Sequence, residues 1–213
     1  FTRQPFIEGP WMDKHEGIYY LQYACPGAEY NVYADGVYIS HSPLGPFTLA
    51  KNNPYSYHPG GFMPGAGHGS TMRDREENLW HASTMRISVN HQFERRVGIW
   101  PAGYDRDGEL FCNQNYGDWP IAVRDGRFDP WSEPQWYLLS YAKPAKASSS
   151  EEGKEADKAV NEDATNWWSA EDSRSGHWLE IDLEKEMDVR AVQINFADDA
   201  LEIPAPGKIG GSA

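Results

Sequence analysis

The segment Glu8-Gly9-Pro10-Trp11 leads, a few residues later, into the aromatic run Gly17-Ile18-Tyr19-Tyr20-Leu21-Gln22-Tyr23. Proline fixes its own φ and keeps the preceding residue out of the helical region, so this segment is bent and extended. The run that follows is rich in Tyr and Ile, which are typical of strands. We therefore expect Glu8 at the mouth of a sheet, beside the indole of Trp11. Apolar surroundings suit a general acid, because they disfavour the ionised carboxylate. The alternative is an exposed carboxylate at a strand end.

Two series of short strands are predicted from apolar alternation and turn residues. Each series has a polar or glycine-bearing first strand, an aromatic second, a long third and a short fourth. The series begin about 60 residues apart, at Glu8 and His68. The expected strands after residue 8 are 17–24, 30–40 and 46–49, and those of the second series are 68–73, 79–85, 96–102 and 109–112. Four-stranded repeats of this length are typical of the blades of a β-propeller.

The amino-acid composition indicates which kinds of binding partner suit this chain. The chain has 213 residues and a net charge of −13, which argues against nucleic acid and against an anionic membrane surface. No apolar run is long enough to span a bilayer. Nine Trp and twelve Tyr suit a β-rich core and also suit stacking on sugar rings. The two cysteines, Cys25 and Cys112, have neither a disulfide framework nor a metal-ligand spacing.

A glycine-rich segment, residues 59–70, separates the two series and contains His68 between two glycines. It lacks the Gly-Lys-Ser/Thr ending of a phosphate loop. Its glycines allow close backbone approach and positive φ. We expect His68 to face the channel at the entry of a strand, although a lone histidine also serves often as a structural residue.

Three motifs follow one another along the first part of the chain. They are Glu8-Gly9-Pro10-Trp11 with Lys14 and Tyr19-Tyr20-Leu21, then the segment 40–47 (SHSPLGPF), then 65–70 (GAGHGS). Together they resemble the pattern of glycoside hydrolase family 43. The resemblance covers about residues 1–125. It implies a five-bladed β-propeller that hydrolyses glycosidic bonds with inversion, in a secreted or periplasmic protein without an organic cofactor. It also implies that Glu8 is the general acid and that His68 holds a metal ion, commonly calcium, or a water in the axial channel.

An inverting glycosidase also needs a carboxylate base. In the family this base and a pKa-tuning aspartate precede the acid, and the seven residues before Glu8 contain no Asp. Asp35, Asp74, Asp105 and Asp107 are expected at turns. We therefore expect the base to be missing, and the chain by itself to be inactive with unpaired strand edges.

Two arginines and one tryptophan are candidate sugar-binding residues. Arg95 and Arg96 precede a predicted strand, and the resemblance directs one arginine of this region at the sugar. Because side chains alternate along a strand, only one of the pair faces inward, and the sequence does not distinguish them. Trp11 is a candidate wall of the first sugar subsite, with a core indole between blades as the alternative.

A second domain is expected after a stiff Pro- and Trp-rich connector near residues 129–136. The strands expected at 178–183 and 189–196 alternate in polarity. With the loop 158–170, they resemble the first half of a discoidin-like domain, the β-sandwich of coagulation-factor type C domains and of carbohydrate-binding module family 32. Relatives often bind structural calcium near the loop 161–165, for which a solvated acidic loop is the alternative. Residues 207–213 are expected to be a tail.

The expected fold class is therefore all-β. A partial five-bladed propeller occupies residues 1–137, and a partial discoidin-like β-sandwich of jelly-roll type occupies residues 138–213. The expected function is hydrolysis of oligo- or polysaccharides of plant type that contain arabinose or xylose. The alternatives are a noncatalytic carbohydrate-binding protein and an adhesion protein. Glu8 favours the enzyme, because a binding platform needs no acid there.

Overall fold

The computed structural model describes residues 6–86, 94–119, 121 and 126–197. The chain divides into two units, Phe1–Leu138 and Leu139–Ala213, which are described separately. The described residues form strands and two short 3-10 turns and contain no α-helix. No helix within these ranges has the length and apolar character needed to cross a bilayer.

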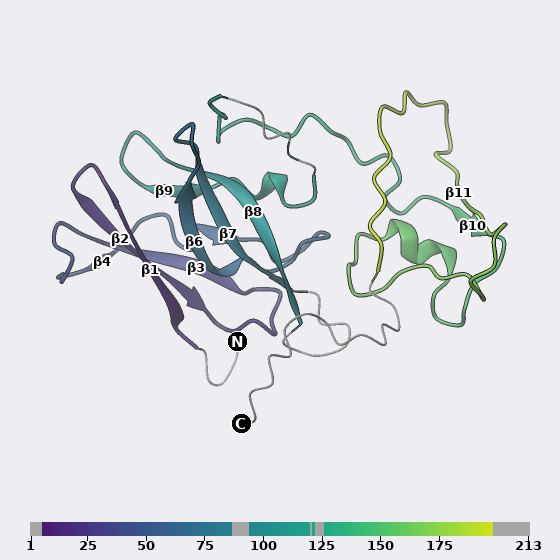
Figure 1. Ribbon diagram of the computed structural model, residues 1–213, viewed down its shortest axis with the longest axis horizontal. Helices are drawn as coiled ribbons and strands as arrows, with labels where there is room; N and C mark the ends of the chain where they lie inside the picture. Colours follow the sequence, from purple (N-terminus) through teal and green to yellow (C-terminus); the bar gives the residue numbers. More distant parts are fainter. Residues whose placement is uncertain (1–5, 87–93, 120, 122–125, 198–213) are drawn as a thin grey trace. The chain divides into compact units, whose positions relative to one another are not determined.

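Two antiparallel sheets make up the first unit (Figure 1). In the first sheet, β1 to β4 pair in chain order and β5 pairs with β3. In the second, β6 to β9 pair in chain order. The strands are β1 (Glu8–His15), β2 (Ile18–Cys25), β3 (Ala34–Ser40), β4 (Thr48–Leu49), β5 (Ser56–Tyr57), β6 (Gly67–Arg73), β7 (Leu79–Arg86), β8 (Arg95–Tyr104) and β9 (Leu110–Cys112). A 3-10 turn, η1 (Gln114–Tyr116), follows β9.

The strands form where alternating residues can be buried on one face. In β2, Tyr20, Gln22 and Ala24 are buried and the residues between them are partly exposed. In the hairpin turns, an aspartate carboxylate accepts hydrogen bonds from backbone N–H groups of the same turn. In the turn after β6, Asp74 Oδ1 accepts from the N–H groups of Glu76 and Asn78. Such Asx turns fix the chain reversal locally.

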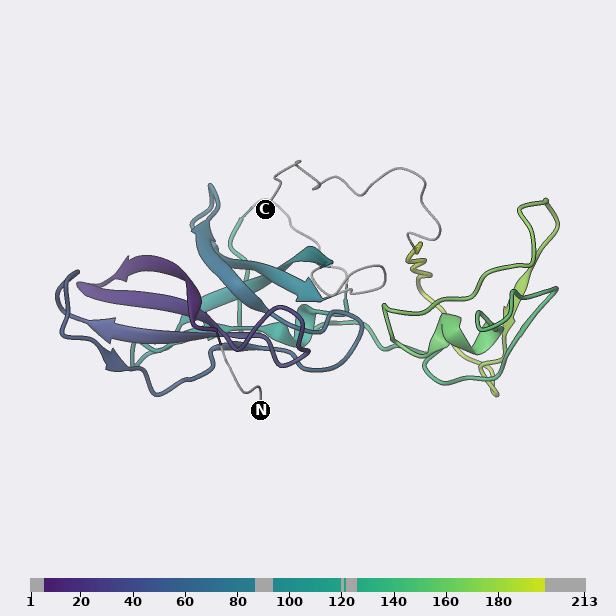
Figure 2. The ribbon, with the colours of Figure 1, turned by 90° about the horizontal axis from the view of Figure 1, so that it is seen from below.

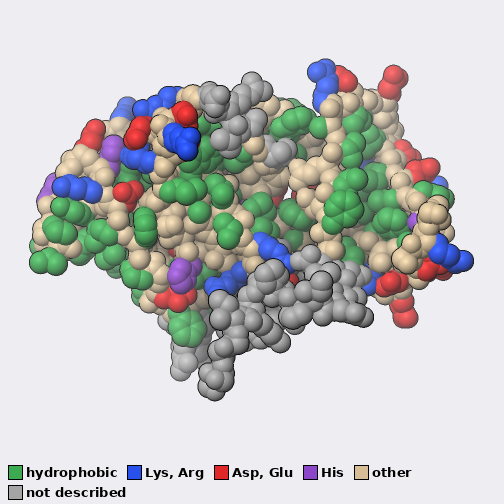
Figure 3. Space-filling model, viewed as in Figure 1, with side chains coloured by type: hydrophobic (Ala, Val, Ile, Leu, Met, Phe, Trp, Pro, Cys, Tyr) green, Lys and Arg blue, Asp and Glu red, His purple; other side chains and the backbone are tan. Residues whose placement is uncertain are grey.

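The core of the first unit lies between its two sheets. β6 packs against β1, β2 and β3, and Figure 2 shows the sheets side by side. The core cluster consists of Tyr20, Val37, Ala50, Tyr55, Ala66, Leu79, Trp100, Ala102, Leu110 and Cys112. On the face in Figure 3, acidic and basic side chains are interspersed with apolar ones. Both cysteines are free thiols.

The second unit contains little regular structure. Its strands β10 (Ala145–Ala147) and β11 (Leu179–Ile181) pair antiparallel, and η2 (Ala156–Val160) is a 3-10 turn. The backbone N–H of Ala142 donates to the carbonyl of the buried Val160 at 2.8 Å. Trp168 Nε1 donates to the carbonyl of Ser149 at 3.1 Å. Loop backbone and indole contacts therefore order this unit.

Four details differ from the sequence prediction. Residues 189–196 form no strand and are exposed, because alternation makes a strand only where a partner strand accepts its hydrogen bonds. The strand expected over 30–40 begins at Ala34, since a turn joins Tyr33 N–H to the carbonyl of Tyr30. β5 is an additional strand. Asp35 is not at a turn: it lies within β3 and is 1% exposed. The tail predicted at 207–213 lies outside the described residues.

Candidate active site

Glu8 stands at the start of β1, next to an irregularity in the ladder. Glu8 is opposite Ala24, but the next regular pair joins Trp11 to Gln22, so β1 carries a β-bulge. Gly9 within the bulge has φ +60°, a conformation that L side chains rarely adopt. Bulges turn a side chain away from its regular direction. The glycine and proline of the motif therefore set the direction of the Glu8 side chain.

His68 stands at the start of β6 in a second bulge. Gly67 is opposite Thr84, and the next regular pair joins Ser70 to Ala82. His68 itself has φ +55°, an uncommon value for a residue with a Cβ. Its Nδ1 lies 3.4 Å from Oε1 of Glu8, and each side chain is 45% exposed. Two bulged strand entries from different sheets thus bring a carboxylate and an imidazole together at an open surface.

The backbone of Gly9 provides the surface on which the His68 ring lies. A Cβ at position 9 would come within 2.7 Å of Cδ2 of His68, closer than any real contact. A side chain at position 9 would therefore displace the imidazole. This is a packing reason for glycine in the Glu-Gly-Pro motif, in addition to its positive φ.

Tyr33 is a member of this site that the sequence prediction missed. Its hydroxyl donates to Glu8 Oε1 at 2.9 Å, and the residue is 1% exposed. Burial and the hydrogen bond to Glu8 both raise the pKa of Tyr33, so it remains a neutral donor at physiological pH. The Tyr33 ring also packs against Gly67, where a Cβ would come within 2.7 Å of it. The loop position of Tyr33 carried no pattern that could have revealed this contact.

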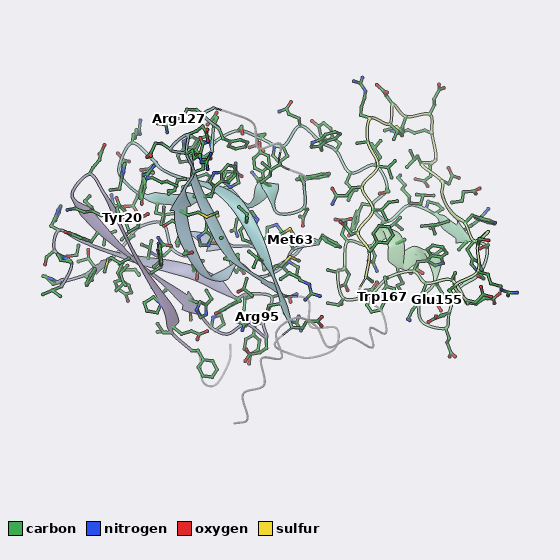
Figure 4. The ribbon with its side chains drawn as sticks, in the orientation of Figure 1. Tyr20, Met63, Arg95, Arg127, Glu155 and Trp167 are labelled. Atoms are coloured by element: carbon green, nitrogen blue, oxygen red, sulfur yellow. The ribbon has the colours of Figure 1, made fainter. Side chains whose placement is uncertain are left out.

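The two candidate arginines differ in their surroundings. Arg95 begins β8, at the end of the sheet seen in Figure 4, and its positive charge opposes the rise in the pKa of Tyr33. Arg96 Nη2 lies 3.5 Å from Glu94 Oε1, and its Nη1 donates to the Arg95 carbonyl. Of the two arginines, Arg95 is the one whose charge acts on Tyr33.

Trp11 lies opposite Gln22 in β1 and is 43% exposed. An indole with this much accessible surface is available to a ligand.

Behind the open site, a series of neighbouring polar groups, most of them buried, crosses between the two sheets. Asp35 Oδ2 lies 3.0 Å from His81 Nε2, and His81 Nδ1 lies 3.0 Å from the Tyr55 hydroxyl. The Tyr55 hydroxyl donates to Gln22, whose amide donates to Thr71. The series ends where the hydroxyls of Thr71 and Tyr104 donate to Asp13 Oδ2, at 2.9 and 3.1 Å. No sequence pattern indicates this role for His81, because its partners Tyr55 and Asp35 come from other strands.

A calcium ion takes six to eight oxygen ligands. Within the described ranges, no three His, Cys, Asp or Glu side chains come together as a metal site. In the loop 161–165, Asp163 Oδ1 already accepts from the backbone N–H and the hydroxyl of Thr165. In this loop the Asp163 carboxylate therefore serves its own turn.

The arrangement at Glu8 can exchange a proton with a ligand. The Glu8 side chain is 45% exposed rather than enclosed by the apolar surroundings expected from the sequence, and a buried phenol holds its carboxyl group on the other side. A general acid must reach the leaving oxygen and keep one orientation while it does so. Accessibility and orientation are both present at Glu8.

Comparisons with known proteins agree with this outline. A family model described as glycosyl hydrolases family 43 matches residues 2–110, and a model of the F5/8 type C domain matches residues 144–206. These matches and the two open sheets confirm the all-β class with a partial propeller and a partial discoidin-like domain.

Individual relatives cover only parts of the chain. A β-D-galactofuranosidase from Aspergillus niger is 40% identical over 47 residues, which are 22% of this chain and 14% of that protein. An endo-1,4-β-xylanase from Bacteroides thetaiotaomicron has a TM-score of 0.46 and 24% identity, over 51% of this chain and 38% of its own. A xylan β-1,4-xylosidase from Bacillus halodurans has a TM-score of 0.47 and 24% identity, over 68% of this chain and 29% of its own. The chain thus spans well under half the length of these proteins.

Proposed function

Because this chain belongs to glycosyl hydrolases family 43, we propose that it is part of an inverting glycosidase in which Glu8 is the general acid. The observation that carries the proposal is the setting of Glu8. Its Oε1 accepts from the buried Tyr33 hydroxyl and faces His68 Nδ1, while the side chain stays open to a ligand. The proposed substrates are oligo- or polysaccharides of plant type with arabinose or xylose units.

The proposed reaction is a single displacement at the anomeric carbon. Glu8 donates its proton to the glycosidic oxygen as the bond from that oxygen to the anomeric carbon breaks. A water attacks the opposite face of the carbon and gives its proton to a carboxylate base. The two carboxyl groups must stand roughly 6.5–9.5 Å apart to admit that water.

The base is not assigned to a residue of this chain. Asp35 is buried beside His81, while Asp74 and Asp105 accept backbone N–H groups of their own turns. These positions suit structural roles. We accordingly propose that the 213-residue chain alone does not turn over substrate and that the full-length protein does.

Arg95 and Trp11 are the proposed sugar contacts, with Arg96 as the alternative to Arg95. A guanidinium can donate to two hydroxyls, and an indole can stack on the apolar face of a sugar ring. His68 is proposed to face a water or a cation at the ring axis. The family assignment also suggests a secreted or periplasmic protein.

A carbohydrate-binding role is proposed for the second unit, on the basis of its F5/8 type C match. Its Trp178 is 50% exposed and can stack on a sugar. If Glu8 has no part in catalysis, binding or adhesion becomes the function of the whole chain.

The test uses the full-length protein and its Glu8→Gln variant. Nitrophenyl arabinofuranoside, xyloside and galactofuranoside are assayed together with the matching methyl glycosides, and NMR identifies the anomer released first. A methyl glycoside has a poor leaving group and therefore depends most on the general acid. On methyl glycosides, kcat/KM of Glu8→Gln is expected to be about 10²- to 10⁴-fold lower than that of wild type. Glu16→Gln is the control, because that side chain is 83% exposed in the next turn. Equal activity of wild type and Glu8→Gln would exclude the acid role.

A further inference from the structure

The β6 bulge leaves the backbone N–H of Gly69 without an acceptor in the regular ladder. A side chain from the other sheet supplies the acceptor instead. Gly69 N–H donates to Oδ2 of Asp35 in β3 at 2.9 Å. A bulge normally leaves its extra residue without a ladder partner. Asp35 therefore supplies the acceptor that fixes the backbone immediately after His68.

His68 depends on such fixed neighbours. Its φ of +55° is sparsely populated for a residue with a Cβ, and such conformations persist only where the surroundings enforce them. On one side Gly67 is packed against the Tyr33 ring, and on the other Gly69 is held by Asp35. These two anchors direct the imidazole of His68 towards Glu8 rather than along the regular face of β6.

Asp35 is itself held in a closed, dry environment. It is 1% exposed, and His81, which is 0% exposed, approaches the same Oδ2 with Nε2 at 3.0 Å. Among the described residues, Asp35 Oδ1 and His81 Nε2 have no hydrogen-bond partner, so the two side chains are close neighbours without a directed hydrogen bond between them. A carboxylate shielded from water makes a stronger bond to an N–H group.

The space around Gly69 is also closed. A Cβ at position 69 would lie 2.2 Å from His81 Cε1 and 2.6 Å from Asp35 Oδ2. The side chains of Asp35 and His81 are thus in close contact with the backbone of the bulge at Gly69. A change at Asp35 or His81 is transmitted to His68 through one peptide unit.

We propose that Asp35, supported by His81, is a positioning residue for the proposed acid: by holding the Gly69 N–H it keeps His68 against Glu8. This inference rests on the proposed function of Glu8. Asp35 touches neither substrate nor the reacting atoms. Its removal should therefore impair proton donation by Glu8 more than it impairs the rest of the reaction.

The leaving group separates these two effects. Hydrolysis of a methyl glycoside needs a well-placed acid, whereas a dinitrophenyl glycoside releases a stable anion and needs almost none. In the full-length protein, Asp35→Ala should lower kcat/KM on the methyl glycoside about 100-fold, as expected for a catalytic group displaced by about 1 Å. Activity on the dinitrophenyl glycoside should change little. Asp35→Asn should recover most of the loss, because its amide oxygen can still accept from Gly69.

Asp74→Asn is the matched control. Asp74 is an aspartate of the same unit that holds a turn after β6, so its loss should lower activity on both substrates by the same factor. An equal loss on both substrates for Asp35→Ala would overturn the positioning role. If Glu8→Gln itself shows no dependence on the leaving group, it is the proposed function that fails.

Loss of a buried carboxylate can prevent folding, which near-UV circular dichroism would reveal. In that case the double variant Asp35→Leu/His81→Phe decides. It replaces both buried polar partners by apolar side chains of similar size, a change that often preserves folding. It should show the same selective loss on the methyl glycoside, and an equal loss on both substrates would overturn the proposal.

Discussion

Nδ1 of His68 lies 3.4 Å from Oε1 of Glu8, although the two residues belong to the first strands of different sheets. Each residue stands in a β-bulge at the entry of its strand. Neither bulge alone would create the contact. It forms because β1 and β6 pack against each other with their entries at the same end.

Tyr33→Phe is expected to lower kcat/KM of the full-length protein about tenfold on methyl glycosides. The variant removes the hydroxyl that donates to Glu8 Oε1, and a hydrogen bond to a charged group contributes about 1.5–3 kcal/mol. Steady-state kinetics on methyl and dinitrophenyl glycosides is the measurement. Tyr30→Phe, three residues earlier and 37% exposed, is the control. Unchanged kinetics in Tyr33→Phe would show that this bond does not orient the acid.

Gly9→Ala and Gly17→Ala separate backbone strain from steric contact. Both glycines have positive φ, but a Cβ at position 17 meets nothing within 4 Å, whereas one at position 9 meets His68. In each variant we expect the free energy of unfolding to fall by about 1 kcal/mol, because alanine tolerates a positive φ poorly. In Gly9→Ala the free energy of unfolding should fall by about 1–3 kcal/mol more, because the added Cβ collides with the His68 ring. Urea denaturation followed by Trp fluorescence measures the difference, and only Gly9→Ala should also reduce activity. Equal stability of the two variants would contradict the packing of His68 on Gly9.

Asp74→Asn should destabilise the protein at neutral pH and matter less in acid. The hydrogen bond from Trp80 Nε1, with those from Asn78 and Glu76, holds the pKa of Asp74 below its ordinary 3.8. A depressed folded-state pKa adds stability above the unfolded pKa, and this contribution is lost as the pH falls through the folded value. The difference in thermal midpoint between wild type and variant should therefore be largest near pH 7 and shrink below pH 3.8. A difference that does not change with pH would argue against these bonds.

Cys25 should react with iodoacetamide before Cys112. Burial raises the pKa of both thiols, and Cys112, which is 6% exposed, is the more deeply enclosed. The thiolate is the reactive form, so both should react more slowly than a free cysteine. Peptide mass spectrometry at pH 8 should find Cys25 labelled in the native protein and Cys112 labelled only after denaturant. Equal labelling of both in native buffer would contradict the closed core around Leu110 and Trp100.

Some of the candidate site could not be predicted from the sequence. Tyr33 and Asp35 lie in and just after a loop and show no pattern that indicates contact with Glu8 or Gly69. The pair Asp35-Gly36 predicts a turn, but Asp35 is a buried residue within β3. Residues 189–196 show the reverse error, because their alternation is clear and yet no strand forms.

The local features of this protein follow from short stretches of its sequence. Side-chain alternation, Asp-bearing turns and the Gly-Pro and Gly-His-Gly motifs are properties of neighbouring residues. They predict β2, β6 and β7 and the positions of Glu8 and His68 at strand entries close to where these are found. Three contacts depend instead on how the chain packs in space: the Tyr33 hydroxyl donates to Glu8, Asp35 accepts the Gly69 N–H in place of a neighbouring strand, and His81 lies beside Asp35. These contacts join strands that are far apart in the chain. Their formation depends on how two sheets pack, because periodicity specifies which face of a strand is buried but not which side chain it will meet there.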